Sequence, residues 1–365
     1  NITPNQITLV VDGETLLNRD FSSIAKADGE SINIPSPSFN VEYTDSVNGD
    51  SILGSFRAPT RTGFTASGWY YLSGKDYIQI TGENMQTVLD GAFDTNKTMT
   101  IYAGWTIDKL QITLSVQNAT ASVSAEESAK LVDNHNGTYS VNYFSTITVK
   151  VTGAEGYKLD NITYSGNAQA FTPTGVGTKN NGQATISQIR TGGTITITME
   201  EIMINVTVNG NTPAFVDEVT LSGEGWDDYA QSIAYNDAGV QASTFLPQWS
   251  APAGTYNFAG YTYGEGTPVA EQTLQDIVGQ ANEDVNISFT ASWTGVKYSI
   301  HFNVTENGSL EGSDTIADLV FGQELDFDFP VATLSGRVSI WNTSADGEGR
   351  VYGRGSYLQD VGTLS

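Results

Sequence analysis

The sequence predicts a mostly β protein built from several small domains in tandem. Thr, Ser, Gly, Val and Ile are abundant and the chain has 17 Tyr, and this mixture favours pleated strands and turns over helices. Hydrophobic residues make up 39% of the 365 positions, which is too many for a disordered chain. A chain of this length can form two to four domains that each bury a core. Strand-like alternation and an internal repeat support the same fold class.

One sequence motif occurs twice. The first copy is FRAPTRTGFTASGW, Phe56–Trp69, and it closes with IYAGWT at Ile101–Thr106. The second copy is WSAPAGTYNFAGY, Trp249–Tyr261, and it closes with FTASWT at Phe289–Thr294. Each has a proline, two aromatic residues around a glycine, and then Ala-x-Trp-Thr. Because an internal repeat outranks local signals, we expect a string of small β domains.

The expected secondary structure is mainly antiparallel strands. Apolar and polar residues alternate with a period of two in five segments: Ile7–Val11, Ile112–Val116, Thr146–Val151, Thr194–Thr198 and Ile204–Val208. Asn-Gly pairs predict hairpin turns at Asn48, Asn136, Asn181, Asn209 and Asn307. Helical periodicity is confined to Glu83–Phe93 and Ala270–Gln280, each upstream of a closing Ala-x-Trp-Thr.

The repeats place the domain boundaries. Each closing Trp leads within a few residues to a Lys and a new strand, which predicts domains at 1–106, 107–203, 204–294 and 295–365. The second has a different β pattern from the first and third, and we expect it to be β-sandwich-like. The connections are very short, so neighbouring domains should have restricted relative motion and form an elongated chain.

The fourth segment is shorter than the second and could be incomplete. We expect either that the native chain continues beyond Ser365 or that a strand of a neighbouring copy completes the sheet. The apolar, alternating N-terminal run Ile2–Val11 is the candidate donor strand. The chain begins at Asn1 rather than Met, which suggests a processed protein or a fragment.

The first copy of the motif resembles the Listeria–Bacteroides repeat, also called the internalin B-repeat. The residues that carry the resemblance are PTRTGFTASGWY, Pro59–Tyr70, and IYAGW, Ile101–Trp105. The second copy departs from the pattern: it lacks the Arg, and Gly260-Tyr261 replaces Gly-Trp. The resemblance covers about 1–106 and 204–294. It implies a β-grasp-like module, found in tandem on secreted and cell-surface proteins, that acts as a spacer and has no catalytic residues.

Charge and composition exclude several classes of function. The net charge is −25, and no Lys or Arg lies between Arg190 and Lys297. Such a surface repels nucleic acid and anionic lipid, so we expect no nucleic-acid partner. The chain has no cysteine, which excludes disulfides and thiolate chemistry. It also has no run of about 18 apolar residues, so we expect no membrane span within it.

Catalytic and metal-binding patterns are absent from the sequence. The two histidines, His135 in a turn and His301 in a strand, fall in different predicted domains, and neither has an evident catalytic partner. We therefore expect no enzyme activity, no catalytic residues and no cofactor. Calcium is the one alternative, because Asp326, Asp328 and Asp346–Glu348 are acidic, although their spacing fits no calcium loop.

Aromatic residues and sequons complete the set of candidate residues. We expect Trp69, Trp105, Tyr261 and Trp293 to form the cores of the repeats. Trp226, Trp249 and Trp341 either cover domain junctions or stack on sugar rings, and we favour junctions. Asn-x-Ser/Thr sequons, which are glycan sites in some organisms, occur at Asn1, Asn96, Asn118, Asn136, Asn161, Asn205, Asn286, Asn303, Asn307 and Asn342.

These features predict an extracellular, cell-surface stalk or adhesin-like protein without enzyme activity. A second hypothesis is a self-assembling subunit of a surface layer or filament, with strand exchange between copies. A third is a carbohydrate-binding accessory region of a larger secreted protein. The expected partners are neighbouring copies, other cell-surface proteins or glycans.

Overall fold

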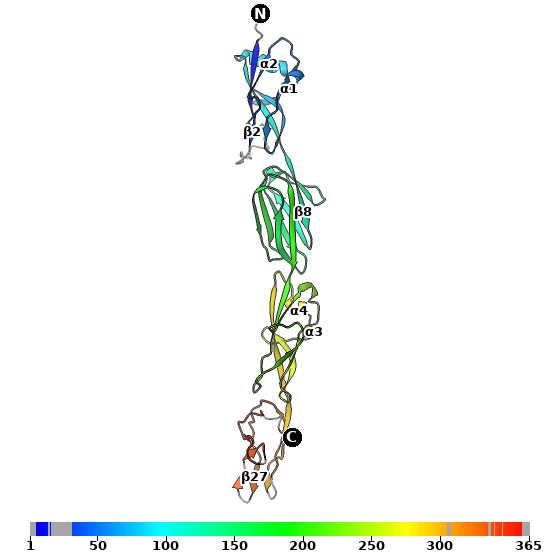
Figure 1. Cartoon of the computed structure of the whole chain (residues 1–365), viewed down its shortest axis with the longest axis vertical. Coiled ribbons are helices and arrows are strands. Elements are labelled where there is room, and N and C mark those ends of the chain that lie inside the picture. The colour runs from blue at the N-terminus through cyan, green and yellow to red at the C-terminus, as the bar shows by residue number, and fades with distance from the viewer. Residues whose placement is uncertain are drawn as a thin grey trace. The chain divides into compact units, whose positions relative to one another are not determined.

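The computed structural model describes residues 5–13, 15, 31–304, 308–334, 337–338, 340–344 and 346–359, and these form a mostly β structure of many small sheets (Figure 1). The chain divides into two compact units, Asn1–Glu200 and Glu201–Ser365. Each unit contains two successive β domains and is described separately below.

The first domain is one mixed sheet with helices. Its elements are β1 (Gln6–Asp12), β2 (Ile32–Asn33), β3 (Ser38–Glu42), α1 (Gly49–Ser55), β4 (Thr60–Arg61), β5 (Phe64–Ser73), β6 (Asp76–Gln79), α2 (Met85–Asp94) and β7 (Thr98–Ile107). The sheet order is β2-β4-β5-β7-β1-β3, and β6 pairs with β5. The first and last strands, β1 and β7, are central and parallel. This is a β-grasp arrangement.

The helix α2 completes the core of the first domain. Its apolar residues recur at helical spacing, so Met85, Val88, Leu89 and Ala92 lie on one buried face. They belong to the same cluster as the alternate residues of β1 and the two tryptophans of the motif. The helix therefore forms where the period of the apolar residues changes from two to about 3.6.

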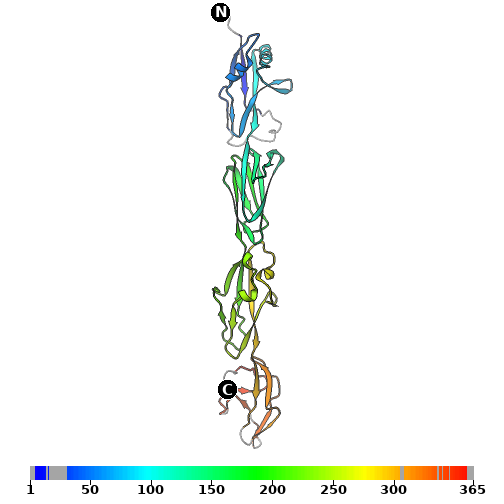
Figure 2. The same cartoon turned by 90° about the vertical axis from the view of Figure 1, so that its right-hand side faces the viewer.

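The second domain is a sandwich of two sheets (Figure 1 and Figure 2). Its strands are β8 (Lys109–Val116), β9 (Ala119–Ala125), β10 (Val132–Asp133), β11 (Thr138–Asn142), β12 (Ile147–Gly153), β13 (Tyr157–Tyr164), β14 (Ala168–Thr174), β15 (Gly182–Ile189) and β16 (Gly193–Glu201), with a short 3-10 helix at Glu127–Ala129. The sheet orders are β10-β11-β8-β16-β13 and β14-β15-β12-β9. Alternate residues of both sheets meet in one core, for example Ile112 and Ile195 from one and Val149 and Ile186 from the other.

The third domain repeats the topology of the first. Its elements are β17 (Met203–Asn209), β18 (Thr220–Ser222), β19 (Ala230–Ala234), a 3-10 helix (Tyr235–Asp237), α3 (Ala242–Phe245), β20 (Gln248–Ser250), β21 (Tyr256–Tyr263), β22 (Thr267–Pro268), α4 (Leu274–Val278) and β23 (Val285–Gly295). The order β19-β17-β23-β21-β22 corresponds to β3-β1-β7-β5-β6, and β17 is again parallel to β23. A capping box between Thr273 and Asp276 starts α4.

The two copies of the motif share one register. In the first, Ala66 lies opposite Trp105 and Trp69 opposite Ala103, and a β-bulge falls before Gly68. In the second, Phe258 lies opposite Trp293 and Tyr261 opposite Ala291, with the bulge before Gly260. The φ angles of the two glycines are +133° and +117°, values that residues with a Cβ rarely adopt. The glycine of the motif is therefore required by the bulge.

The motif aromatics lie in equivalent places. Trp69, Trp105 and Tyr261 are buried, whereas Trp293 is half-buried. The indole N–H of Trp105 donates to the carbonyl of Gly13 at 3.2 Å, and that of Trp293 to the carbonyl of Gly210 at 2.8 Å. Each closing Trp thus binds the residue that follows the first strand of its own domain.

The described residues of the fourth domain form three small sheets. Its strands are β24 (Lys297–His301), β25 (Ser309–Glu311), β26 (Thr315–Val320), β27 (Val331–Leu334), β28 (Arg337–Val338), β29 (Trp341–Asn342) and β30 (Val351–Tyr352). The pairings are β24-β26, β25-β27-β28 and β29-β30. Among its described residues, the buried cluster is small and contains Leu319, Leu325, Tyr352 and Leu358.

The N-terminal run is not a free donor strand. Its described part forms β1, which pairs with β7 on one side and β3 on the other, and Ile7 and Leu9 are fully buried. The start of the run, 2–4, lies outside the described residues. The alternating apolar residues that suggested a donor strand are buried in the core of their own domain. Moving this strand to another copy would therefore expose that core.

Removing the closing Trp should destabilise the first domain. Trp105 is 3% exposed, so Trp105→Ala should lower the free energy of unfolding by about 3–5 kcal/mol through lost burial and a cavity. Urea denaturation measures this change. Tyr77→Ala, at a surface strand, is the control and should have a much smaller effect. An unchanged midpoint for Trp105→Ala would contradict its place in the core.

Alkaline pH should destabilise the second domain. Burial raises the pKa of Tyr164 to about 12, and its hydroxyl donates to the Thr191 carbonyl at 2.6 Å. The folded-state pKa lies above the ordinary value of about 10. The stabilisation is therefore complete below about pH 10 and is lost as the pH rises toward about 12. Thermal melting across this window should show a falling midpoint, with a shallower slope in Tyr164→Phe. An equal slope in both proteins would contradict the prediction.

Candidate functional site at the domain junctions

The junction inside Asn1–Glu200 is built around one residue. Asp108 alone separates β7 from β8. Its N–H donates to the Gly63 carbonyl at 3.0 Å, and its carbonyl accepts from the N–H of Tyr143 at 2.9 Å. Its carboxylate accepts from the Thr65 hydroxyl at 2.8 Å. The linker is therefore bonded to both domains through its backbone.

Aromatic packing closes the same junction. The rings of Phe64, from the first domain, and Tyr143, from the second, are both buried, with centroids 6.3 Å apart in an edge-on geometry. Gly63 precedes Phe64 with φ +76°, and a Cβ there would lie 2.1 Å from the Tyr143 ring. Glycine is thus required both by the turn and by the close approach of the ring.

The junction inside Glu201–Ser365 has the same construction. Val296 alone separates β23 from β24. Its N–H donates to the Thr255 carbonyl at 2.9 Å, and its carbonyl accepts from the N–H of Phe321 at 3.0 Å. The Phe321 ring packs edge-on against Tyr256 at 5.3 Å. Tyr256 occupies the position of Phe64, and Phe321 that of Tyr143.

The equivalence extends into the downstream domains. Phe144 and Gly322, which follow the junction aromatics, both have left-handed backbones, with φ +67° and +76°. The Phe144 N–H donates to the Ile189 carbonyl, and the Gly322 N–H to the Leu358 carbonyl, at 2.7 and 2.8 Å. The fourth domain therefore has the same left-handed residue, with the same kind of hydrogen bond, after its junction aromatic as the second domain has. Each unit is a β-grasp domain followed by a second β domain, joined in the same way.

The junction tryptophans expected from the sequence lie elsewhere. Trp249 is in the core of the third domain, Trp226 packs against Phe245, and Trp341 packs against Phe302 within the fourth domain. The junctions use Phe and Tyr instead. The available signal was the aromatic residue directly after the turn in each motif copy, Phe64 or Tyr256; the downstream partner had no recognisable motif.

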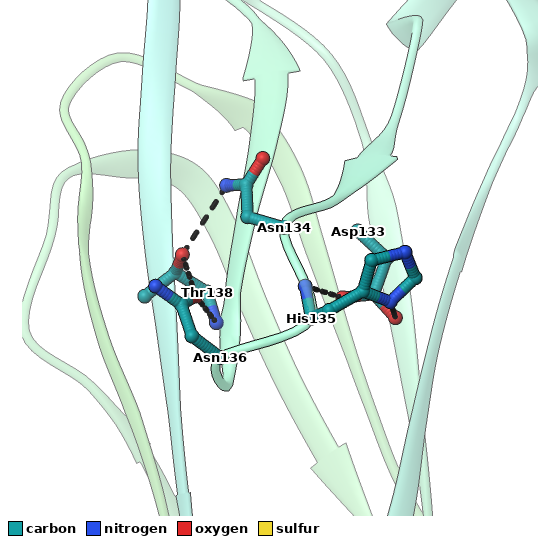
Figure 3. Close-up of polar contacts among 5 residues, drawn as sticks. All are labelled: Asp133, Asn134, His135, Asn136 and Thr138. Carbon is teal, nitrogen blue, oxygen red and sulfur yellow. Dashed lines mark hydrogen bonds and ion pairs between the residues drawn. The ribbon is translucent and has the colours of Figure 1, made fainter.

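The turn that contains His135 is held by local hydrogen bonds (Figure 3). The His135 N–H donates to Asp133 Oδ1 at 2.8 Å, and its ring Nδ1 lies 3.9 Å from Asp133 Oδ2. Asn136 Oδ1 accepts from the N–H and hydroxyl of Thr138, and the Asn134 amide donates to the same hydroxyl. The His135 side chain is 89% exposed, and Figure 3 shows it directed away from Thr138. His301 is also exposed, with Nδ1 3.0 Å from the Thr315 hydroxyl.

Three of the acidic residues considered for calcium, Asp326, Asp328 and Asp346, have protein partners for their carboxylates. Asp326 and Asp328 form ion pairs with Arg354 at 2.9 and 3.2 Å. Asp346 accepts from the Ser344 hydroxyl and the Glu348 N–H, and the Ser344 bond in particular lowers the pKa of Asp346. Among the described residues, no three His, Asp or Glu side chains gather closely enough to hold a metal ion. No helix in the same residues is long and apolar enough to cross a bilayer.

The sequons differ in how free their amides are. The exposed sequon asparagines are Asn96, Asn118, Asn136, Asn161, Asn286 and Asn303. The half-buried ones are engaged: the Asn205 amide donates to Asn286, and the Asn342 amide to the carbonyls of Gly347 and Gly349. A glycan on Asn342 would replace one amide hydrogen and so remove at least one of these two bonds. Asn1 and Asn307 lie outside the described residues.

Comparisons with known proteins do not identify a family for this chain. No family model matches the chain, and no curated protein matches it. One similar solved structure is the TIE protein of Bacillus anthracis, with a TM-score of 0.24 and 11% identity. The match covers 71% of this chain and 49% of that protein, so this chain spans about half its length. A likeness at this level supports no statement about function.

The aromatic contact at the first junction should couple the two domains energetically. A double-mutant cycle with Phe64→Leu and Tyr143→Leu, followed by urea denaturation of the full chain, should give a coupling free energy of about 0.5–1.5 kcal/mol. A control cycle pairs Phe64→Leu with Tyr139→Leu, which changes a ring that packs in the second-domain core. The control should give additive effects. Additivity in both cycles would show that the junction contact carries no coupling.

Proposed function

We propose that this chain is a non-enzymatic structural segment of an extracellular, cell-surface protein, in which tandem β domains act as a stalk. The observation that carries the proposal is the junction built twice, with one linker residue bonded to both of its neighbours. Such junctions suit a protein that must keep successive domains in fixed positions relative to each other. The resemblance to tandem surface repeats supports the same role, and the acidic surface would keep crowded copies apart.

Single-residue connections add support within each unit. Asp108 and Val296 are the sole residues between the last strand of the upstream domain and the first strand of the downstream domain. A flexible linker would need many residues without secondary structure. We therefore propose that the two domains within each unit are held rigidly and that a fixed spacing between them is the property on which the function depends.

A second candidate function, a self-assembling subunit, is favoured by the surface of the fourth domain. Val331, Leu334, Ile340 and Val351 are exposed there, around the short strands β27 and β30. Strands with open edges and apolar side chains are sites for strand addition from another chain. Since β1 belongs to its own sheet, a donor would have to come from elsewhere.

Small-angle scattering tests the stalk proposal. A compact body of 365 residues has a radius of gyration of roughly 20 Å. We expect a value well above this, unchanged on dilution in low salt. A value near the compact one would exclude a stiff series of domains. Light scattering in rising salt separates the second candidate: screening weakens the acidic repulsion and should promote association of an assembling subunit.

A further inference from the structure

A groove of about 570 Å³ opens on the third domain at the end of β17. Its walls come from the end of β17, from Ser288 on β23, from the loops around Asn211 and Asp217, and from the turn that holds Asp228 and Tyr229. The volume lies within the range of small-ligand sites, roughly 300–1,000 Å³. The fold assembles it from segments that are distant in the sequence.

An aromatic ring lines this groove with one face open. Tyr229 stacks on Trp249, with centroids 5.6 Å apart and planes inclined by 24°. Trp249 is 7% exposed and packed against Gly210, where a Cβ would lie 2.8 Å from the indole. Tyr229 is nevertheless 54% exposed. The buried Trp249 ring therefore supports one face of the Tyr229 ring, and the other face provides a flat apolar surface for a ligand.

The turn presents Tyr229 at an unusual position. The N–H of Ala230 donates to the Asp227 carbonyl at 3.0 Å, so Asp228 and Tyr229 form the tip of a tight turn. Both have positive φ, +49° and +61°, where hairpin turns usually carry Asn-Gly. The N–H of Val208 donates to the Tyr229 carbonyl at 2.9 Å and ties this backbone to β17. Tyr229 is thus held in a left-handed backbone conformation, which a tyrosine rarely adopts.

The rest of the lining is polar. Hydroxyl and amide groups come from Thr207, Asn209, Asn211, Thr212 and Ser288. Asp217, Glu218 and Asp228 add carboxylates, which accept hydrogen bonds from hydroxyl groups. No Lys or Arg lies between Arg190 and Lys297 to attract an anion. The groove therefore suits an uncharged ligand that has many hydroxyls and one apolar face.

The first domain provides an internal comparison. A groove of about 590 Å³ lies at the end of β1, lined by Val10, Val11, Asp12, Gly13, Thr15, Ile34 and Thr100. Six of these positions correspond to lining positions of the third-domain groove, with Asp12 and Thr100 in the places of Asn209 and Ser288. No aromatic ring appears in this described lining. Among the described lining residues of the two grooves, only those of the third domain provide a stacking surface.

We propose that the third-domain groove binds a neutral oligosaccharide, with the apolar face of one pyranose ring on Tyr229 and its hydroxyls bonded to the amides and carboxylates around it. This activity goes beyond the proposed stalk role and does not depend on it. An anionic sugar would be repelled by Asp217, Glu218 and Asp228.

Titration of the full chain with chitotriose, cellotriose and maltotriose tests the proposal, by calorimetry and by the fluorescence of the tryptophans. At least one should bind, with an affinity that does not change with salt. Tyr229→Asn removes the ring but keeps a residue that tolerates positive φ, and it should weaken binding at least about tenfold. Tyr229→Phe keeps the stacking surface and should bind nearly as well as the unchanged chain.

Thr100→Ala, in the first-domain groove, is the matched control and should leave the affinity unchanged, and thermal melting shows that each variant is folded. Absence of binding by all three sugars at millimolar concentration would overturn the proposal. An affinity unaffected by Tyr229→Asn would also overturn it. So would salt-sensitive binding of a tetra-arginine peptide without sugar binding, since the groove would then be a cation site.

Discussion

The backbone of a single linker residue determines how each β-grasp domain meets the domain that follows it. Asp108 in one unit and Val296 in the other donate an N–H to the upstream turn and accept from an N–H downstream. Rotation at the linker would break these hydrogen bonds, so it is opposed from both sides. An aromatic pair packs across the junction beside each linker, and Gly63 leaves the space in which the Tyr143 ring packs.

This constraint explains the two aromatic positions that the copies of the motif share, one before and one after the glycine of the bulge. The first, Phe64 or Tyr256, faces the neighbouring domain, and the second, Trp69 or Tyr261, fills the core. The bulge at the glycine between them adds one residue to the strand and so changes which face the following side chains occupy. One short segment thereby links the interior of a domain to its junction.

The sequence was a good guide to features with a local cause. The expected helix at Glu83–Phe93 is α2, Met85–Asp94, because its apolar spacing is clear over several turns. The segment Ala270–Gln280 is helical only over Leu274–Val278, because Gly279 adopts positive φ and ends the helix. Strand alternation likewise located β1, β8 and β17. It could not identify their parallel partners, since alternation specifies a face and not a neighbour.

The candidate sites depend on contacts that no local pattern encodes. Tyr143 carried no motif, and only the fold brings it to Gly63. Asp228-Tyr229 forms a tight turn without the Asn-Gly signal, so the exposed ring of the groove was not foreseen. Trp249 was considered for a junction or for stacking on a sugar ring. It is instead a core residue, and the exposed Tyr229 ring stacks on it.

In three of the four domains, the first strand pairs in parallel with the last: β1 with β7, β8 with β16, and β17 with β23. A mechanical pull on such a domain enters at the start of the first strand and leaves at the end of the last. The two neighbours are then drawn past each other along their length. The hydrogen bonds between them run across the strands, so they are loaded together in shear and do not open one after another. The connectivity that lets each domain follow directly from its predecessor also gives it a geometry that resists tension.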